Sequence, residues 1–250
     1  MELKEFFAQN PKAAIAFSGG VDSAYLLYAA IKYGADVKAY YVKGPFQPHF
    51  ELEDARRLAS ELGADMEIIP LNVLENDDIS SNPPERCYHC KRAILTAIMD
   101  RAGKDGFGLL LDGSNASDDA ADRPGMRALK ELSVRSPLRE CGLTKAEIRR
   151  LSKEAGLFTH NKSAYACLAT RIPTGEAITP EKLEATERAE EYLFSLGFKN
   201  FRIRLFNGCA RIQLRAADMP KAVAQANEIN QKLKKYYASV MLDMEARDEQ

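Results

Sequence analysis

The chain has 250 residues, a formal net charge of −1 and a hydrophobic content of 46%. These values are typical of a soluble globular protein, and the length allows one large domain or a main domain with a smaller addition. No run of about 18 apolar residues is present, which argues against a membrane span, and the nearly balanced charge disfavours broad electrostatic binding to nucleic acid.

The compartment is predicted from the N-terminal segment and the cysteines. Residues 1–5 lack the basic stretch and apolar core that mark a secretory signal, so we expect a cytoplasmic protein. In a reducing compartment, the five cysteines are better interpreted as thiols, metal ligands or catalytic groups than as disulfides.

The N-terminal part of the chain alternates between expected helices and strands. The helices are expected over residues 2–9, 21–33 and 51–62, and the strands over residues 13–17, 37–42 and 66–71. Strands and helices that alternate with short connections predict an α/β fold with a doubly wound parallel sheet. Ligands of such sheets bind at the carboxyl ends of the strands.

The turn after the first strand has the features of a phosphate site. Its glycines allow close approach of the backbone to a ligand, and the N–H groups at the following helix start attract an anion. A carboxylate beside phosphate would repel it unless Mg2+ bridges the two, so ATP or another nucleotide is expected rather than a lone phosphate. The Walker lysine is absent, which disfavours transfer of the γ-phosphate. The turn reads Ser18-Gly19-Gly20-Val21-Asp22-Ser23.

The middle of the chain supplies a second stretch for the same edge of the sheet. Residues 72–85 are expected to form a surface loop, and a helix is expected from Arg86 through Met99. After a strand over 108–111, the acidic and amide-rich residues 112–119 should face the nucleotide. The candidates there are Asp112 and Asn115, with Asp118 or Asp119 as a metal ligand or a helix cap.

The remaining residues predict a loop-rich stretch followed by a small α+β unit. Residues 123–139 are expected to be irregular, and a capping box at Thr144 starts a helix that ends near Ala155. The C-terminal expectations are helices over 179–196 and 219–233 and strands over 201–206, 210–214 and 238–242. We therefore expect one domain over 1–172 and a small α+β domain over 173–250.

The cysteines leave several interpretations open. Cys87 and Cys90 form a single C-x-x-C pair, while Cys167 lies in a loop of small residues. Thiolates from these three positions would suit a [4Fe-4S] cluster whose fourth iron lacks a protein ligand. A zinc site completed by His89 or His160 and unliganded thiols are the competing interpretations.

The motifs resemble those of a known family. Residues 18–23 resemble the S-G-G-x-D-S signature of the PP-loop ATP pyrophosphatases, which cleave ATP between the α and β phosphates and adenylate a substrate oxygen. With the other motifs, nearly the whole chain resembles the LarE family of ATP-dependent sulfur transferases, which make the nickel-pincer nucleotide cofactor of lactate racemase. The other motifs are residues 82–91, 111–119, 123–125, 136–139, 167–171 and 202–204.

The resemblance implies a substrate and a sulfur chemistry. ATP and Mg2+ would adenylate a carboxylate of pyridinium-3,5-biscarboxylic acid mononucleotide, and sulfur would then displace AMP to give a thiocarboxylate. One branch of the family sacrifices the sulfur of a cysteine that matches Cys167. Another branch has three cysteines and a [4Fe-4S] cluster that would deliver bound sulfide. Because Cys87 and Cys90 accompany Cys167, the resemblance favours the cluster branch.

Further site residues are implied by the same resemblance. Arg171, Arg202 and Arg204 match family positions near the sulfur donor, where guanidinium groups would bind phosphate and carboxylates. Thr170 keeps the hydroxyl of the serine that is commoner there, and Glu190 is a further candidate. The simpler interpretation makes Arg202 and Arg204 the solvated face of a strand, and Glu190 ordinary surface.

The expected partners are the pyridinium mononucleotide, sulfide or another sulfur donor, and further copies of the chain in a homo-oligomer. Competing functions are a tRNA thiolase, an amidating ligase and a non-catalytic ATP-binding regulator. The charge balance and the single C-x-x-C pair disfavour the tRNA enzyme, which usually carries basic modules or zinc fingers.

Overall fold

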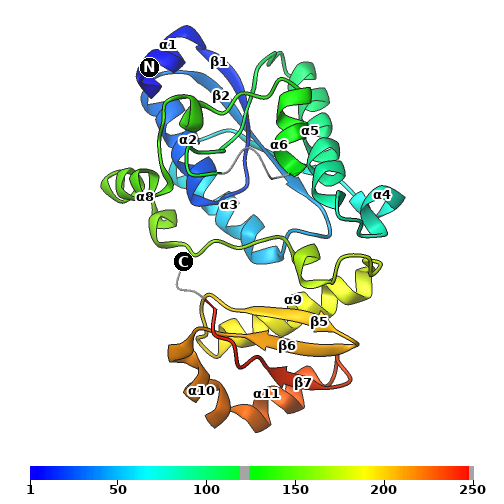
Figure 1. Cartoon of the computed structure of the whole chain (residues 1–250). Helices are drawn as coiled ribbons and strands as arrows, with labels where there is room; N and C mark the ends of the chain where they lie inside the picture. The colour runs from blue at the N-terminus through cyan, green and yellow to red at the C-terminus, as the bar shows by residue number, and fades with distance from the viewer. Residues whose placement is uncertain (119–123, 248–250) are drawn as a thin grey trace. The chain divides into compact units, whose positions relative to one another are not determined.

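The computed structural model describes residues 1–118 and 124–247. The described chain forms two compact units, and each is presented separately below (Figure 1). The first unit comprises residues 1–73 and 85–162, and the second comprises residues 74–84 and those from 163 onward. The second unit thus takes in a short stretch from the middle of the chain. The predicted domain boundary between residues 172 and 173 stays a prediction.

The first unit is built on a parallel four-stranded sheet with the strand order β3-β2-β1-β4. The strands are β1 (Lys12–Ala16), β2 (Asp36–Lys43), β3 (Met66–Pro70) and β4 (Leu110–Leu111). The strand order changes direction between β1 and β4, so the loops after these strands flank the crevice where ligands of such sheets bind.

Helices cover both faces of this sheet because successive strand residues point in opposite directions. The N-terminal helix, α2, α3 and α8 cover one face, and α5 and α6 cover the other (Figure 1). Ile15 and Tyr41 pack in the core on the first face, whereas Ala14 and Val42 pack in the core on the second. The predicted doubly wound α/β fold is therefore confirmed. The helices are α1 (Leu3–Gln9), α2 (Val21–Lys32), α3 (His49–Glu61), α5 (Arg86–Lys104), α6 (Pro124–Glu131) and α8 (Lys145–Glu154).

The helical content exceeds the prediction in stretches that contain proline. The stretch expected to be irregular holds α6 and α7 (Pro137–Glu140), and both of these helices begin at a proline. Proline suits the first helical position, where its missing N–H group costs no hydrogen bond. The predicted loop over 72–85 contains η1 (Val73–Glu75) and α4 (Asp77–Ser80), whose first turn is capped by Asn76. These stretches were wrongly predicted as loops.

The second unit contains a three-stranded sheet with the order β5-β6-β7. Asn207 and Gly208 join β5 (Arg202–Phe206) to the antiparallel β6 (Cys209–Gln213) with φ values of 48° and 74°, as the predicted hairpin turn requires. The predicted long C-terminal helix is interrupted at Gln225. The other elements are β7 (Val240–Leu242), η2 (Phe158–Asn161) in the first unit, η3 (Leu168–Arg171), α9 (Pro180–Ser195), η4 (Ala216–Asp218), α10 (Met219–Ala224) and α11 (Ala226–Leu233).

Asn82 ties the stretch 74–84 to the rest of the second unit. Its side chain is buried, and its amide donates hydrogen bonds to the carbonyl oxygens of Ile172, Pro173 and Glu176 at 3.3, 2.7 and 3.2 Å. The backbone carbonyl oxygen of Asn82 accepts from the backbone N–H group of Gly175 at 2.8 Å. The left-handed backbone of Asn82, with φ of 56°, is a conformation that asparagine tolerates better than most residues.

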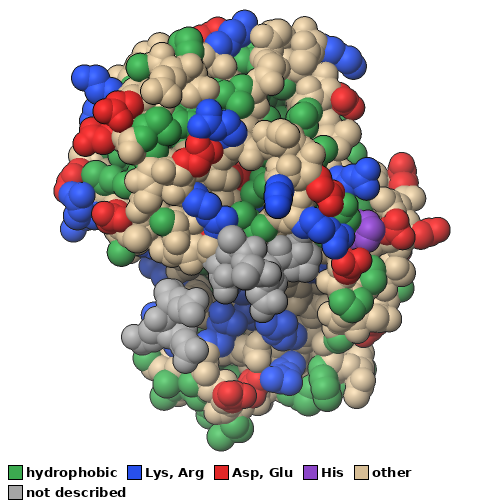
Figure 2. Space-filling model, turned by 45° about the horizontal axis from the view of Figure 1, so that its top comes forward, with side chains coloured by type: hydrophobic (Ala, Val, Ile, Leu, Met, Phe, Trp, Pro, Cys, Tyr) green, Lys and Arg blue, Asp and Glu red, His purple; other side chains and the backbone are tan. Residues whose placement is uncertain are grey.

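The surface carries charges of both signs. Acidic and basic side chains are interspersed over the face of the first unit shown in Figure 2. A search of residues 1–118 and 124–247 finds no helix long and apolar enough to cross a membrane.

Candidate functional site

The turn between β1 and α2 is built around Gly19. Its φ of 69° is a conformation that L side chains rarely adopt, and a Cβ atom placed on it would lie 3.1 Å from the Cβ atom of Ala55 in α3. Gly20 is the N-cap of α2 and provides no side-chain cap. The first N–H groups of this helix therefore have no capping side chain and suit an anion.

The two serines of the turn hold its shape. The Ser23 hydroxyl donates to the Gly20 carbonyl at 3.2 Å and accepts from the Ser18 backbone N–H group at 3.3 Å. The hydroxyls of Ser18 and Ser23 are themselves 3.1 Å apart. Both serines therefore organise the backbone of the turn as well as offering polar groups to a ligand.

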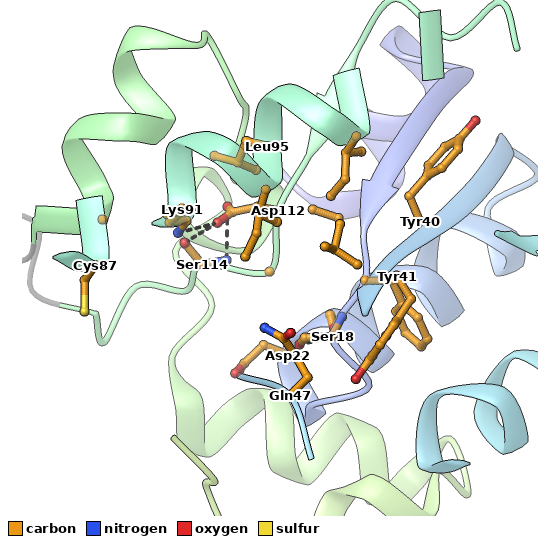
Figure 3. A pocket seen from close by; sticks show the side chains of 18 of the residues that line it. Ser18, Asp22, Tyr40, Tyr41, Gln47, Cys87, Lys91, Leu95, Asp112 and Ser114 are labelled. Carbon is orange, nitrogen blue, oxygen red and sulfur yellow. Dashed lines mark hydrogen bonds and ion pairs between the residues drawn. The ribbon is translucent and has the colours of Figure 1, made fainter. Parts of the chain in front are cut away.

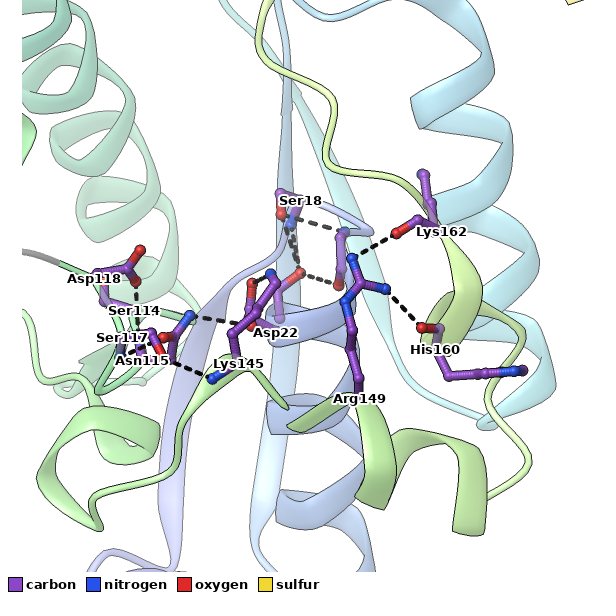
Figure 4. Close-up of polar contacts among 12 residues, drawn as sticks. Ser18, Asp22, Ser114, Asn115, Ser117, Asp118, Lys145, Arg149, His160 and Lys162 are labelled. Atoms are coloured by element: carbon purple, nitrogen blue, oxygen red, sulfur yellow. Dashed lines mark hydrogen bonds and ion pairs between the residues drawn. The ribbon is translucent and has the colours of Figure 1, made fainter. Parts of the chain in front are cut away.

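Asp22 is held by residues from two later segments. The Lys145 ammonium, at the start of α8, forms an ion pair with its Oδ2 atom, and the Asn115 amide donates to its Oδ1 atom at 3.3 Å (Figure 4). Arg149, one turn further along α8, donates to the carbonyl oxygens of His160 and Lys162 at 2.7 and 2.9 Å. Lys145 thus joins the start of α8 to the phosphate turn, and Arg149 joins α8 to the segment that follows it.

Asp112, in the loop after β4, is likewise held by residues from other segments. Its carboxylate accepts from the hydroxyls of Ser136 and Ser114 at 2.6 and 2.7 Å and pairs with the Lys91 ammonium at 3.4 Å. A Cβ atom on Gly113 would lie 2.9 Å from the backbone nitrogen of Ser23, so only glycine permits this approach. The loops after β1 and β4 thus meet at the crevice.

A cavity of about 590 Å3 opens at this edge of the sheet. Figure 3 shows Ser18 and Asp22 on one side of it and Lys91, Asp112 and Ser114 on another. Its wall is polar near the two loops and apolar where α5 and α6 cover it. The remaining lining residues include Ala16, Phe17, Val42, Ile94, Leu95, Ile98 and Met126. A volume of this size accommodates a nucleotide-sized ligand.

The C-x-x-C pair lies in the first turn of α5. Cys87 lines the cavity, and a guanidinium nitrogen of Arg86 lies 3.2 Å from its sulfur atom. Cys90 is three positions further on, which places both sulfurs on the same side of the helix. None of the five cysteines is in a disulfide. Within the described residues, no group of three or more His, Cys, Asp or Glu side chains is arranged around a common metal position.

Cys167 belongs to the second unit, where it precedes η3. Its carbonyl oxygen accepts from the Thr170 hydroxyl at 2.8 Å, and that hydroxyl in turn accepts from Arg171 at 2.7 Å. Arg171 pairs with Glu190 through an Nε–Oε1 contact of 2.6 Å, and both residues are 1% exposed. Burial alone would lower the pKa of Arg171, but the hydrogen bond and charge of Glu190 raise it on balance.

Two further arginines lie in β5 of the second unit. Arg202 donates to the carbonyl oxygens of Phe201 and Ala164 at 2.7 and 2.9 Å. Burial and the charges of Arg171 and Arg247 lower the pKa of Arg202 to about 10. The same causes lower the pKa of Arg204, which donates to the Thr170 carbonyl at 3.0 Å. The cationic forms of both residues would therefore be stabilised by an added anion.

Comparison with known proteins identifies the family. A family model described as "Queuosine biosynthesis protein QueC" matches residues 12–82, which include the phosphate turn. An uncharacterized protein of Synechocystis sp. is 39% identical over 85% of this chain and 80% of its own length. The pyridinium-3,5-bisthiocarboxylic acid mononucleotide synthase of Lactiplantibacillus plantarum is 34% identical over 93% of this chain and 86% of its own length. The chain belongs to the LarE family.

Other relatives of this LarE-family chain are more distant. The tRNA-specific 2-thiouridylase MnmA of Thermotoga petrophila is 27% identical over 78% of this chain and 71% of its own length. The resemblance to the LarE family that the motifs predicted is confirmed, while membership of its [4Fe-4S] branch stays a prediction.

The structure of the LarE-family chain brings some predicted site residues together at the cavity. The lining includes Ser18, Asp22, Ser23, Asp112 and Asp118. Gly19, Gly20 and Val21 form the turn behind it, and Asn115 bonds to Asp22. Asp119 lies outside the described residues. Cys167, Thr170, Arg171, Arg202 and Arg204 gather in the second unit, together with Glu190, which is buried rather than ordinary surface.

Sequence reasoning missed several residues of the LarE-family cavity. Lys91 follows the C-x-x-C pair, and Lys145 follows the cap of α8, but nothing in their local patterns indicates that they pair with Asp112 and Asp22. Tyr41 was seen only as part of a buried strand. Gln47 lies between the expected elements, and Glu51 begins the helix expected over 51–62, with nothing to indicate that either residue lines the cavity.

Proposed function

We propose that this protein is an ATP-dependent sulfurtransferase acting on pyridinium-3,5-biscarboxylic acid mononucleotide. The observation that carries the proposal is the match over most of both chains to a pyridinium-3,5-bisthiocarboxylic acid mononucleotide synthase, combined with a nucleotide-sized cavity at the S-G-G-V-D-S turn. The product is a thiocarboxylate of the same nucleotide, on the route to the nickel-pincer cofactor of lactate racemase.

The proposed reaction has two steps, adenylation of the carboxylate and transfer of sulfur. A substrate carboxylate oxygen bonds to the α-phosphorus of ATP, the bond from that phosphorus to the bridging oxygen breaks, and pyrophosphate leaves with the electron pair. A sulfur nucleophile then bonds to the acyl carbon of the adenylate, and AMP leaves with the carboxyl oxygen. Adenylation is needed because a free carboxylate has no adequate leaving group.

The phosphate turn is assigned to ATP. Ser18, Gly19, Gly20, Val21 and Ser23 contact the phosphates through backbone N–H groups and hydroxyls. Asp22 supplies carboxylate oxygens of the kind that Mg2+ prefers, and Asp112 and Asn115 complete the nucleotide site from the β4 side.

Lysine side chains supply the positive charge that the turn itself lacks. Lys145 and Lys91 form ion pairs with Asp22 and Asp112. If Asp22 holds Mg2+, the Lys145 ammonium would lie beside the turn, where it could pair with a phosphate oxygen. The ion pair of Lys145 with Asp22 thus keeps a cation that can bind phosphate next to the turn.

Cys167 is assigned to the sulfur transfer. Its backbone is fixed by Thr170, which Arg171 holds in turn, and the buried Glu190 holds Arg171. Arg202 and Arg204 contribute positive charge for the phosphate and carboxylates of the substrate. Arg171 positions these groups rather than donating to the substrate directly, because its hydrogen bonds are taken up by Glu190 and Thr170.

The sulfur source divides the proposal into two versions. In the first version, Cys87, Cys90 and Cys167 would hold a [4Fe-4S] cluster, and the support for it is that Cys87 and Cys90 lie three positions apart at the start of α5 and neither is in a disulfide. A cluster held by these thiols would supply an iron that carries sulfide. In the other version Cys167 gives up its own sulfur and becomes dehydroalanine.

The proposal also includes the compartment and the oligomeric state of the protein. We assign the protein to the cytoplasm, where a reducing environment keeps cysteine thiols available as sulfur carriers or metal ligands. Its partners are the pyridinium mononucleotide and a sulfide donor, and the expected homo-oligomer is tested by light scattering.

The decisive experiment combines product analysis with metal analysis. Anaerobically purified protein is incubated with ATP, Mg2+, sulfide and the pyridinium substrate, and AMP, pyrophosphate and the thiocarboxylate are quantified. We expect the three products in equal amounts. AMP formation that does not require the pyridinium substrate would reject the proposal. Thiolation of tRNA in place of the pyridinium nucleotide would reject it in favour of the function named for the MnmA relatives.

Cysteine variants separate the two sulfur sources. If a cluster is used, Cys87→Ala loses iron, inorganic sulfide and multiple turnover, whereas Cys209→Ala, in β6 of the second unit, retains all three. Single turnover in iron-free wild type, with a mass loss at Cys167 that equals one molecule of hydrogen sulfide, supports the sacrificial version instead.

A further inference from the structure

Tyr41 carries a buried hydroxyl that no other described residue satisfies. The side chain extends from β2, is 2% exposed and packs in the core on the α2 and α3 face of the sheet. Its hydroxyl oxygen is shielded from solvent and has no hydrogen-bond partner in residues 1–118 and 124–247. Burying such a group without a partner costs free energy, so its presence calls for a partner that binds from outside the chain.

The neighbouring residue provides a contrast. Tyr40 points to the other face of the sheet, and its hydroxyl donates to the Asp105 carboxylate at 2.8 Å. Both tyrosines line the cavity, and Figure 3 shows Tyr41 on the side that also holds Ser18 and Gln47. The Tyr41 side chain therefore belongs to the wall of the candidate nucleotide site, and its hydroxyl, which lacks a partner among the described residues, lies just behind the cavity surface.

The charges around Tyr41 restrict the group that it can meet. Burial raises the pKa of the Tyr41 hydroxyl, and the carboxylates of Glu51 and Asp54 raise it further, so the hydroxyl stays protonated and acts as a donor. Asp54 is paired with Lys162 at 2.7 Å, while Glu51 also lines the cavity. A phosphate next to Glu51 would be repelled, whereas an uncharged acceptor would not.

The loop that follows β2 holds this part of the wall in place. The side-chain oxygen of Gln47 accepts from the backbone N–H group of Gly44 at 2.9 Å, and the Lys43 ammonium donates to the Gln47 carbonyl. A Cβ atom on Gly44 would lie 2.7 Å from the carbonyl oxygen of Leu71, so the loop requires glycine there. The surroundings of Tyr41 are thus organised before a ligand arrives.

We propose that the Tyr41 hydroxyl donates a hydrogen bond to an uncharged acceptor on the nucleoside part of ATP, either a ribose hydroxyl or the N1 edge of the base. The inference rests on the proposed function, because ATP is taken as the occupant of the cavity. Tyr41 then contributes to the choice of nucleotide, while the turn at Ser18 to Ser23 binds phosphates that all nucleoside triphosphates share.

The test measures nucleotide binding by calorimetry with wild type and Tyr41→Phe. The ligands are ATP, 2′-deoxy-ATP, 3′-deoxy-ATP and 1-deaza-ATP, each with Mg2+. We expect Tyr41→Phe to bind ATP about fivefold more weakly, which corresponds to about 1 kcal/mol. The analogue that lacks the atom accepting from the Tyr41 hydroxyl should bind wild type and Tyr41→Phe with equal affinity. Tyr28→Phe, which removes a hydroxyl from the same core outside the cavity, should behave as wild type.

A second measurement exploits the unsatisfied hydroxyl. Without nucleotide, Tyr41→Phe should unfold at a higher temperature than wild type, because it removes a buried polar group that lacks a partner among the described residues. Lower thermal stability, unchanged affinity for ATP, or an equal loss for every analogue would each overturn the inference. If wild type binds no ATP at all, the proposed function itself fails.

Discussion

Replacing Glu190 by glutamine should destabilise the protein by about 3–5 kcal/mol, because it leaves the Arg171 guanidinium buried without its counter-charge. The Glu190 carboxylate accepts from Arg171 at 2.6 and 3.3 Å, from the Tyr165 hydroxyl at 2.5 Å and from the Ile203 backbone N–H group at 3.0 Å. Glutamine keeps one acceptor oxygen and nearly the same volume. The other oxygen becomes an amide that donates, so the loss combines the missing charge with the hydrogen bonds that this oxygen accepted.

The size of this effect follows from burial. Both partners are 1% exposed, so water cannot solvate the arginine that remains. An exposed pair on the same helix provides the matched control: Glu184 lies 3.9 Å from Arg188, and its side chain is 72% exposed. Glu184→Gln should cost less than about 1 kcal/mol, because surface ion pairs contribute little.

The assay is equilibrium unfolding in urea, with the free energy extrapolated to water. In a double-mutant cycle, Arg171→Met combined with Glu190→Gln should show a coupling energy of at least about 1 kcal/mol, because removing both charges avoids the unpaired one. A loss for Glu190→Gln no larger than that for Glu184→Gln would refute the assignment of a buried, charge-dependent pair.

Three further outcomes are expected at the nucleotide site. Lys145→Met should lower the affinity for pyrophosphate about tenfold and leave the fold intact, as followed by calorimetry and circular dichroism; unchanged affinity would exclude Lys145 as a phosphate contact. Asp22→Asn should abolish the increase of ATP affinity with Mg2+ in a titration, and persistence of that increase would place the metal elsewhere. Gly113→Ala should destabilise the protein by about 1–3 kcal/mol in urea unfolding, because its Cβ atom would meet the Ser23 nitrogen at 2.9 Å, whereas Gly108→Ala, with nothing within 4 Å, should be close to neutral.

The fold was largely predictable because its strands are short, apolar and separated by clear helix signals. Residues 13–17 and 37–42 alternate with amphipathic helices, and this local pattern is sufficient to predict a parallel sheet. The helices α6 and α7 were missed because both are short and begin at a proline, a residue that occurs in loops as well as at helix starts. The gap in the single helix expected over 219–233 had no marker at Gln225.

The candidate site was predictable only where a motif lies within one short segment. The glycine turn could be recognised by itself, since its backbone requirement and its position before a helix are local. The pairs of Asp22 with Lys145 and of Asp112 with Lys91 join residues far apart in the chain. Composition and periodicity contain no information on such pairs. The burial of Glu190 was likewise hidden, because the acidic residues nearest to it on α9, Glu187 and Glu191, are half-buried and exposed.

The interruption of the second unit by the first has a practical consequence for dissecting the protein. A fragment that begins after residue 172 would lack Asn82, whose amide bridges the carbonyl oxygens of Pro173 and Glu176. Those backbone carbonyl oxygens would then bond only to solvent, and residues 173–176 would lose the hydrogen bonds that hold them in place. A fragment cut only after residue 172 therefore lacks part of its own unit. A fused fragment in which residues 74–84 precede the C-terminal part would be needed to recover the complete second unit.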